Sequence, residues 1–163
     1  MKKIKHRPSR VDREDAAVAL GRRFPVIACR PDDYEPYTER ASSAAGDIRG
    51  MWKRWPDAAA GVRTGEGLVV VVDARRSRRA EPDPSLPTTL TARGPEGVWQ
   101  YFYRCTTPVS SVAALLPGLS LRGRNDHVIV PPTAGWSWHN DAPLAELPDA
   151  IKVAASRVRG ESI

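Results

Sequence analysis

The spacing of hydrophobic and polar residues predicts three helices in this chain. The first is expected to begin at Ser9, which has a capping-box partner in Asp12, and to end at Gly21. The second is expected over residues 47–55 and the third over residues 148–158. The second helix has four apolar residues on one side, of which we expect both tryptophans to lie in the core: Ile48, Met51, Trp52 and Trp55.

Runs of apolar and β-branched residues predict strands between these helices. The run from Leu68 to Asp73 is apolar on both faces, which is typical of a strand inside a covered sheet. Residues 109–116 are expected to form a helical turn. The expected strands are residues 24–29, 59–64, 68–73, 88–92 and 98–104, and a hairpin of residues 119–122 and 127–130. Helices alternate with strands early and hairpins dominate later, so we expect the α+β class, with mixed or antiparallel sheets flanked by helices in a single compact domain.

Composition excludes membrane and disulfide-scaffold proteins. The chain has 163 residues, 41% hydrophobic and 27% charged, as in a soluble globular protein. Its longest aliphatic run, Leu68 to Val72, is far shorter than the roughly 20 residues of a membrane helix, and no signal peptide precedes it. The two cysteines, Cys29 and Cys105, have neither metal-ligand nor redox-motif spacing. We therefore expect a cytoplasmic protein with no membrane partner.

Positive charge is concentrated at the start of the chain. Residues 1–13 carry six bases against Asp12, whereas the other 150 residues carry 19 bases against 18 acids. We expect residues 1–13 to be a flexible basic arm, residues 14–158 the folded domain and residues 159–163 a tail. Such an arm suits contact with a phosphate backbone, and the alternative is a solvated tail. The bases of the arm are Lys2, Lys3, Lys5, Arg7, Arg10 and Arg13.

Seven segments carry a family resemblance in their order along the chain. They are GRRFPVIAC (21–29), PDDYEP (31–36), GDIRGMWKRWPDAAAGVRTG (46–65), GLVVVVDAR (67–75), LPTTLTARGPEGVWQYF (86–102), PGLSLRGRNDHVIVPPT (117–133) and WSWHNDAPLAELPDAI (136–151). Together these segments resemble the bifunctional primase-polymerase (prim-pol) domain of the archaeo-eukaryotic primase superfamily, over about residues 14–155. The resemblance implies a prim-pol-like α+β fold and DNA or nucleotide ligands.

The resemblance also implies a chemistry that this chain does not match. In the family a D-x-D pair and a further aspartate hold two divalent metals, and a histidine helps hold the nucleotide. Here Asp73 is the only acid of the first motif, with Arg75 in the second place. An alignment without a gap puts Val72 and Ala74 there instead. The other positions hold Trp99 for the histidine, Ser120 for the third aspartate and Tyr34 for a loop lysine.

We therefore expect a catalytically degenerate domain that needs no cofactor and binds DNA or a nucleotide without polymerising. Arg75 would either pair with Asp73 or grip a phosphate, and Trp99 would either stack on a base or plug the old site. Arg78 and Arg79 would extend the basic cluster. The expected binding residues are Arg75, Arg76, Arg93, Trp99, Arg122, Arg124 and Thr133 in the domain, and Lys2, Lys3, Lys5, Arg7 and Arg10 in the arm.

Two other functions remain open from the sequence. One is a divergent active enzyme that uses Mn²⁺ or Mg²⁺, with Asp73, Glu96 and Asp126 as rearranged ligands. A replacement metal site of Asp73 with Asp126 and His127 is a variant of this idea. The other is a regulatory domain that uses the fold to bind a protein in replication or regulation. Because the resemblance ends eight residues before Ile163, we expect the chain to act without a helicase segment.

Overall fold

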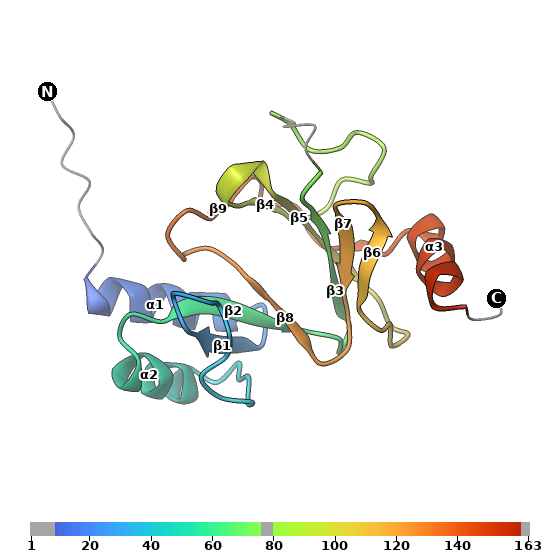
Figure 1. Cartoon of the computed structure of the whole chain (residues 1–163). Helices are drawn as coiled ribbons and strands as arrows, with labels where there is room; N and C mark the ends of the chain where they lie inside the picture. The colour runs from blue at the N-terminus through green and yellow to red at the C-terminus, as the bar shows by residue number, and fades with distance from the viewer. Residues whose placement is uncertain (1–8, 76–79, 161–163) are drawn as a thin grey trace, which may run out of the picture. The chain divides into compact units, whose positions relative to one another are not determined.

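The computed structural model describes residues 9–75 and 80–160, which form two compact units (Figure 1). The first unit ends at Val62 and the second begins at Arg63. The combination of helices with mostly antiparallel strands confirms the α+β class. None of the helices in the described part of the chain is long and apolar enough to cross a membrane.

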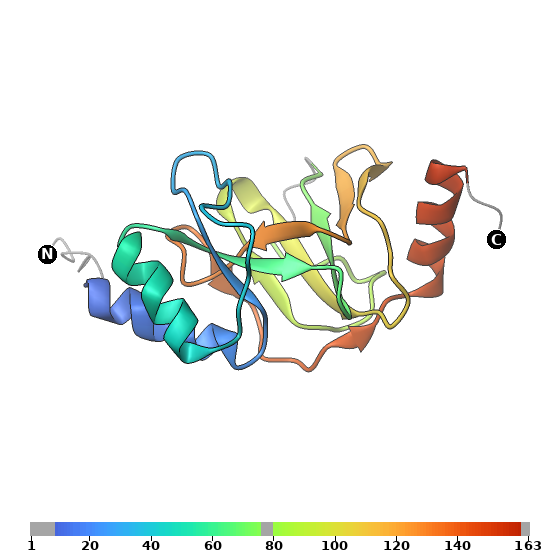
Figure 2. The same cartoon turned by 90° about the horizontal axis from the view of Figure 1, so that it is seen from below.

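The first unit packs two helices against a pair of strands. Its elements are α1 (Arg10–Gly21), β1 (Val26–Cys29), α2 (Ala45–Arg54) and β2 (Ala59–Thr64), the last of which continues into the second unit. β1 and β2 are antiparallel, with Val26 opposite Val62. The helices lie side by side (Figure 2), and their buried positions include Ala17, Leu20, Ile48 and Trp52.

Helix α1 starts after Ser9, as the capping box predicts, so it includes the last four residues of the expected arm. The Ser9 hydroxyl accepts a hydrogen bond from the Asp12 amide at 3.2 Å, and the Asp12 carboxylate accepts one from the Ser9 amide at 3.0 Å. Residues 10–13 are therefore helical, and Arg13 Nε donates to the Pro56 carbonyl at 3.1 Å. The arm bases Lys2, Lys3, Lys5 and Arg7 lie outside the described residues.

The prediction for Trp55 is wrong, whereas that for Trp52 is confirmed. Trp52 is 1% exposed. Trp55 follows the last turn of α2 and is only half-buried. Its ring stacks on the exposed Tyr37, with ring centroids 4.7 Å apart and planes 3° apart. The helix has ended at Arg54, so Trp55 no longer follows the helical period that would turn it inward.

The second unit is built on a sheet whose central strand is β3. Its strands lie in the order β6-β7-β3-β5-β4-β9, and β10 runs parallel to the end of β5. The elements are β3 (Leu68–Asp73), β4 (Thr91–Arg93), a 3-10 turn η1 (Pro95–Gly97), β5 (Trp99–Arg104), β6 (Val112–Leu116), β7 (Leu119–Arg122), β8 (Asp126–Ile129), β9 (Ser137–Trp138), β10 (Ala145–Glu146) and α3 (Asp149–Arg159). The predicted bounds of β3 are confirmed, and those of β5 differ by one residue.

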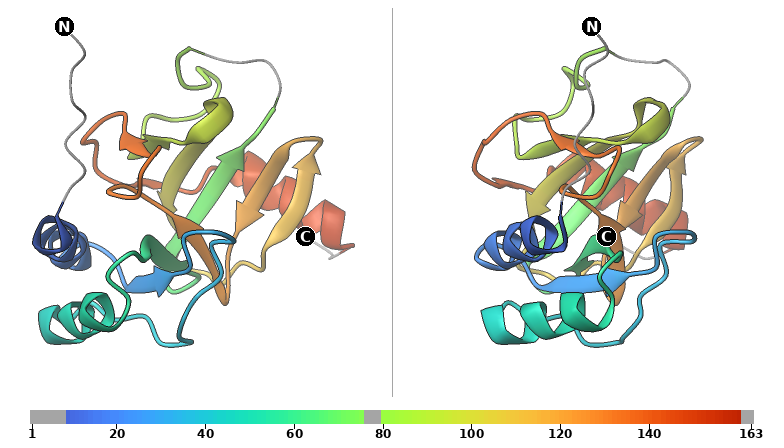
Figure 3. Two further views of the ribbon diagram at one scale, coloured as in Figure 1. Left: turned by 60° about the vertical axis from the view of Figure 1, so that its left-hand side comes forward. Right: turned by 90° about the vertical axis from the view of Figure 1, so that its left-hand side faces the viewer.

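Helix α3 covers one face of this sheet (Figure 3). Its buried residues Ile151 and Ala155 pack in one hydrophobic cluster with side chains of β3, β5 and β7. These sheet residues are at alternate positions of their strands: Val69, Val71, Trp99, Tyr101, Tyr103 and Leu121. The face that carries them is therefore the core face of α3.

Three secondary-structure predictions in the second unit are wrong. Residues 112–116 form β6 instead of a helical turn, because Pro117 and Gly118 (φ 79°) reverse the chain and β7 offers β6 a partner. The expected hairpin of 119–122 with 127–130 does not form, since β6 and β3 occupy both edges of β7. The strand expected over 88–92 begins only at Thr91, because the Thr89 hydroxyl donates to the Phe102 carbonyl.

Candidate functional site

A single carboxylate lies at the end of strand β3. Asp73 is the last residue of an otherwise apolar strand and is opposite Leu119 of β7 and Trp99 of β5. Paired residues of an antiparallel ladder share a face, so Asp73 lies on the face that α3 covers. Its side chain is 4% exposed. A carboxylate at such a position requires a cationic or hydrogen-bonding partner.

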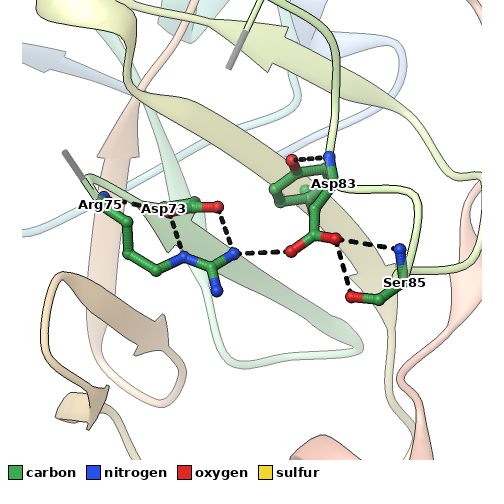
Figure 4. A network of polar contacts seen from close by, with 5 residues as sticks. Asp73, Arg75, Asp83 and Ser85 are labelled. Atoms are coloured by element: carbon green, nitrogen blue, oxygen red, sulfur yellow. Dashed lines mark hydrogen bonds and ion pairs between the residues drawn. The ribbon is translucent and has the colours of Figure 1, made fainter. Parts of the chain in front are cut away.

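Arg75 is that partner (Figure 4). Its Nε donates to Asp73 Oδ1 at 2.9 Å and its Nη2 donates to Asp73 Oδ2 at 2.7 Å. The Arg75 amide also donates to Asp73 Oδ1, at 3.1 Å. This bidentate arrangement fixes the plane of the guanidinium relative to the carboxylate.

A second carboxylate, Asp83, meets the same guanidinium. Arg75 Nη2 donates to Asp83 Oδ2 at 2.7 Å, and the Asp83 side chain is 7% exposed. The other Asp83 oxygen accepts the amide and hydroxyl of Ser85 at 2.9 and 2.7 Å. The Asp83 amide donates to the Tyr101 hydroxyl at 2.8 Å, which ties this loop to β5. Asp73, Arg75, Asp83, Ser85 and Tyr101 are called the Arg75 network below.

Sequence reasoning missed Asp83. The spacing of Asp83 and Ser85 is that of an Asx turn, and this was the one local signal available. It predicts a turn but not the direction in which the carboxylate points. The contact with Arg75 comes from the path of the loop, which no hydrophobic period specifies.

The Arg75 network carries a net charge of −1. Hydrogen bonding to Asp73 raises the pKa of the Arg75 guanidinium, with a smaller contribution from Asp83 against the opposing effect of burial, so Arg75 stays charged. Burial raises the pKa of the Tyr101 phenol against the opposing effect of the Asp83 amide, which donates to its oxygen, and the neighbouring carboxylates add to the rise. Of the two roles expected for Arg75, the structure has the pairing with Asp73. The Nε and Nη2 groups of its guanidinium donate to carboxylate oxygens and not toward an open phosphate position.

Trp99 is packed in the core beside the Arg75 network. It is 2% exposed and belongs to the cluster under α3. The exposed Arg93, its partner in β4, holds its guanidinium carbon 5.1 Å from the Trp99 ring centre. The His139 ring meets it edge-on at 5.1 Å. Trp99 therefore fills its position with apolar bulk, and no ring face is open to a nucleobase.

The expected site residues fall on opposite faces of the sheet. Ser120 is opposite Val72, which is opposite Gln100, so these three share the face that Asp73 does not. Arg122, opposite Val70, lies on that second face too. No single centre of this sheet combines Asp73 with Ser120. The alignment without a gap matches Val72 and Ser120 to two of the family's aspartates. Only this alignment places the two positions next to each other on one face, and neither residue is an acid.

Two exposed arginines flank a tightly packed glycine next to the second face. Arg122 Nη1 lies 3.4 Å from Asp126 Oδ2, and Arg124 donates its amide to the Val109 carbonyl at 2.8 Å. Between them, Gly123 accepts a hydrogen bond from the Thr64 hydroxyl and donates its amide to Ser111 Oγ. Thr133 is half-buried in a turn after Val130.

The remaining expected residues are dispersed. Arg76 lies outside the described residues, as do Arg78 and Arg79, and Arg10 is exposed in the first turn of α1 in the other unit. Glu96 lies in η1 with φ 59°. Tyr34, at the family's loop-lysine position, has φ 61° in the loop after β1.

The residues at Asp73 do not fit the two divalent ions that the resemblance implies. Magnesium and manganese need several oxygen ligands each, and both carboxylates here are bonded to one guanidinium. Across residues 9–75 and 80–160, no three His, Cys, Asp or Glu side chains converge as metal ligands. The alternative sets of Asp73 with Glu96 and Asp126, or with Asp126 and His127, are thus not assembled as one centre within those ranges.

A family model matches most of the chain. The family model described as Bifunctional DNA primase/polymerase, N-terminal, matches residues 16–150. No curated protein matches the chain. The matched range covers most of the sequence and includes the Arg75 network, Trp99 and the Arg122–Arg124 segment.

Proposed function

The chain belongs to the bifunctional DNA primase/polymerase family, and from this premise we propose that it binds DNA or a nucleotide without polymerising. The observation that carries the proposal is the Arg75 guanidinium between Asp73 and Asp83. It supports a site in which a side chain of the protein, and not a metal ion, lies between the two carboxylates. The proposal makes this protein a pseudoenzyme that keeps the family's fold.

The loss of polymerisation follows from what the reaction requires. In-line phosphoryl transfer by this type of enzyme uses two cations that clamp the attacking and leaving oxygens. Those cations need carboxylates on one face and close together. In the alignment without a gap, two of the family's aspartate positions hold Val72 of β3 and Ser120 of β7, which are opposite each other. Neither side chain carries charge, so we expect no metal-dependent synthesis.

Ligand binding is assigned to the exposed arginines and the arm. Arg122 and Arg124 are close in sequence and exposed, and Gly123 holds the backbone between them by hydrogen bonds on both sides. Guanidinium groups pair with phosphate oxygens in a fork. The carboxylate-bound Arg75 is left out of this assignment. Arg93, which is opposite Trp99 in β5, and Thr133 stay in it as separate expected contacts. The arm bases add sequence-independent attraction to a phosphate backbone.

A double substitution tests this assignment. We expect Arg122→Ala with Arg124→Ala to weaken binding to labelled single-stranded DNA roughly ten-fold and to reduce the salt dependence of log K by about 1 to 2, because each phosphate contact releases counterions. Fluorescence anisotropy over a series of NaCl concentrations measures both quantities. The matched control is Arg104→Ala, an exposed arginine of the same sheet that is paired with Glu146.

The outcomes separate the arm from the folded domain. An equal loss of DNA affinity in Arg104→Ala would show that net charge alone causes the weaker binding, which contradicts a local site. Loss of binding only on deletion of residues 1–8 would assign the DNA to the arm. If neither DNA nor nucleotide binds at low salt, the second candidate function applies, a regulatory domain that binds a protein partner through the same fold.

A further inference from the structure

The disagreement between the family's metals and the residues present points to a role for Arg75. We propose that the Arg75 guanidinium is the resident cation of the Asp73–Asp83 pair, in place of a bound metal ion. This inference rests on the proposed function in one respect, because both state that no metal ion binds at Asp73. Its test reads cation binding and stability, so the two can fail separately.

The geometry places one nitrogen at the position of a shared cation. Arg75 Nη2 lies 2.7 Å from Asp73 Oδ2 and 2.7 Å from Asp83 Oδ2. The two oxygens are therefore no further apart than twice that distance. An ion with oxygen ligands at about 2.1–2.6 Å would need only a small inward movement of the two carboxylates to bind both. The guanidinium and such an ion exclude each other, because they require the same oxygens.

Burial makes a cation at this position necessary. The Asp73 and Asp83 side chains are 4% and 7% exposed, and both carboxylates face the same nitrogen. Two like charges so close, and shielded from water, disfavour their ionised forms unless a cation lies between them. Arg75 is only two residues from Asp73 along the chain, so its guanidinium is always present at high local concentration. A free ion therefore competes poorly in the natural protein.

The same cation holds a loop segment to the sheet. Asp83 is bonded to Arg75 on one oxygen and to Ser85 on the other, and its amide donates to Tyr101 of β5. Arg75 in turn is fixed to the end of β3 through Asp73. Removal of the guanidinium leaves the loop bonded to β5 but facing Asp73 with a repulsive contact. An ion that replaces the guanidinium should therefore restore stability as well as charge balance.

Rescue by a metal ion tests this role. Thermal unfolding is measured with and without roughly 1 mM MnCl₂ at matched ionic strength. The four purified proteins are wild type, Arg75→Ala, the double variant Arg75→Ala with Asp83→Asn, and the exposed-pair control Arg104→Ala. We expect the melting temperature of Arg75→Ala to fall and then to rise by several degrees with Mn²⁺. Wild type, the double variant and Arg104→Ala should shift by less than about one degree. Titration calorimetry with Mn²⁺ should show one site in Arg75→Ala alone.

Two outcomes overturn the proposal. One is a folded Arg75→Ala that neither binds Mn²⁺ nor gains stability from it. The other is a wild type that binds Mn²⁺ as tightly as the variant, since a resident guanidinium must compete. If Arg75→Ala does not fold, Arg75→Lys replaces it, because an ammonium keeps the charge but cannot form the fork. Mn²⁺ should then stabilise Arg75→Lys more than wild type, and an equal response would contradict the role.

Discussion

Arg75→Ala is expected to lower the free energy of unfolding by about 3 kcal/mol at neutral pH. The substitution leaves two nearly buried carboxylates, Asp73 and Asp83, without the cation that each now binds. The Arg75 side chain is 26% exposed, so water can reach the space it leaves, and we therefore expect the lower part of the range known for broken buried pairs. Urea unfolding followed by circular dichroism measures the change.

The control for this experiment is an arginine pair on the surface. Arg104 Nε lies 2.7 Å from Glu146 Oε1, but the two side chains are 53% and 59% exposed. Exposed pairs of this kind contribute about 0.2–1 kcal/mol. A loss in Arg75→Ala no larger than that in Arg104→Ala would contradict the role of the Arg75 network in stability.

Gly123→Ala is expected to destabilise the protein by about 3 kcal/mol or more. A Cβ at this position would lie 2.0 Å from the Val109 carbonyl oxygen and 2.9 Å from its carbon, which are backbone atoms that cannot turn aside. The same carbonyl accepts the Arg124 amide, so relief of the overlap also breaks this hydrogen bond. Thermal unfolding measures the loss, and DNA binding should weaken because Arg122 and Arg124 lose their fixed backbone.

A substitution at a second glycine is expected to change stability in the opposite direction. Gly50 lies inside α2, and a Cβ there meets nothing within 4 Å. Gly50→Ala should stabilise the protein by about 0.5–1 kcal/mol, because alanine loses less backbone entropy in a helix. An equal loss in both variants would show that the overlap at Gly123 is not the cause.

The central part of the fold was predictable because local and long-range signals agree there. The apolar run of β3 admits one interpretation, turn residues precede β2 at Pro56 and Asp57, and Gly65 and Gly67 separate β2 from β3. The Ser9 cap likewise fixes the start of α1. Residues 112–116 were mistaken for a helical turn because Ala and Leu favour helices, whereas pairing with β7 makes this segment a strand.

The candidate site was predictable only in part. The sequence placed Asp73 and Arg75 together, and their ion pair was one of the two roles expected for Arg75. It did not reveal Asp83, because a carboxylate in an irregular loop has no periodic signal. The resemblance assigned positions along the chain, but whether two of them share a face depends on strand register. Asp73 and Ser120 differ by one register step and therefore lie on opposite faces.

Primer synthesis is the most direct test of the proposal that this family member binds without polymerising. Purified wild type and Asp73→Asn are supplied with template DNA and nucleotides, once with Mg²⁺ and once with Mn²⁺, and circular dichroism checks that both are folded. We expect no product from wild type above the Asp73→Asn background with either ion, as the proposal requires. Product that depends on Asp73 would contradict it, and would mean that Arg75 gives up its carboxylates to metal during the reaction.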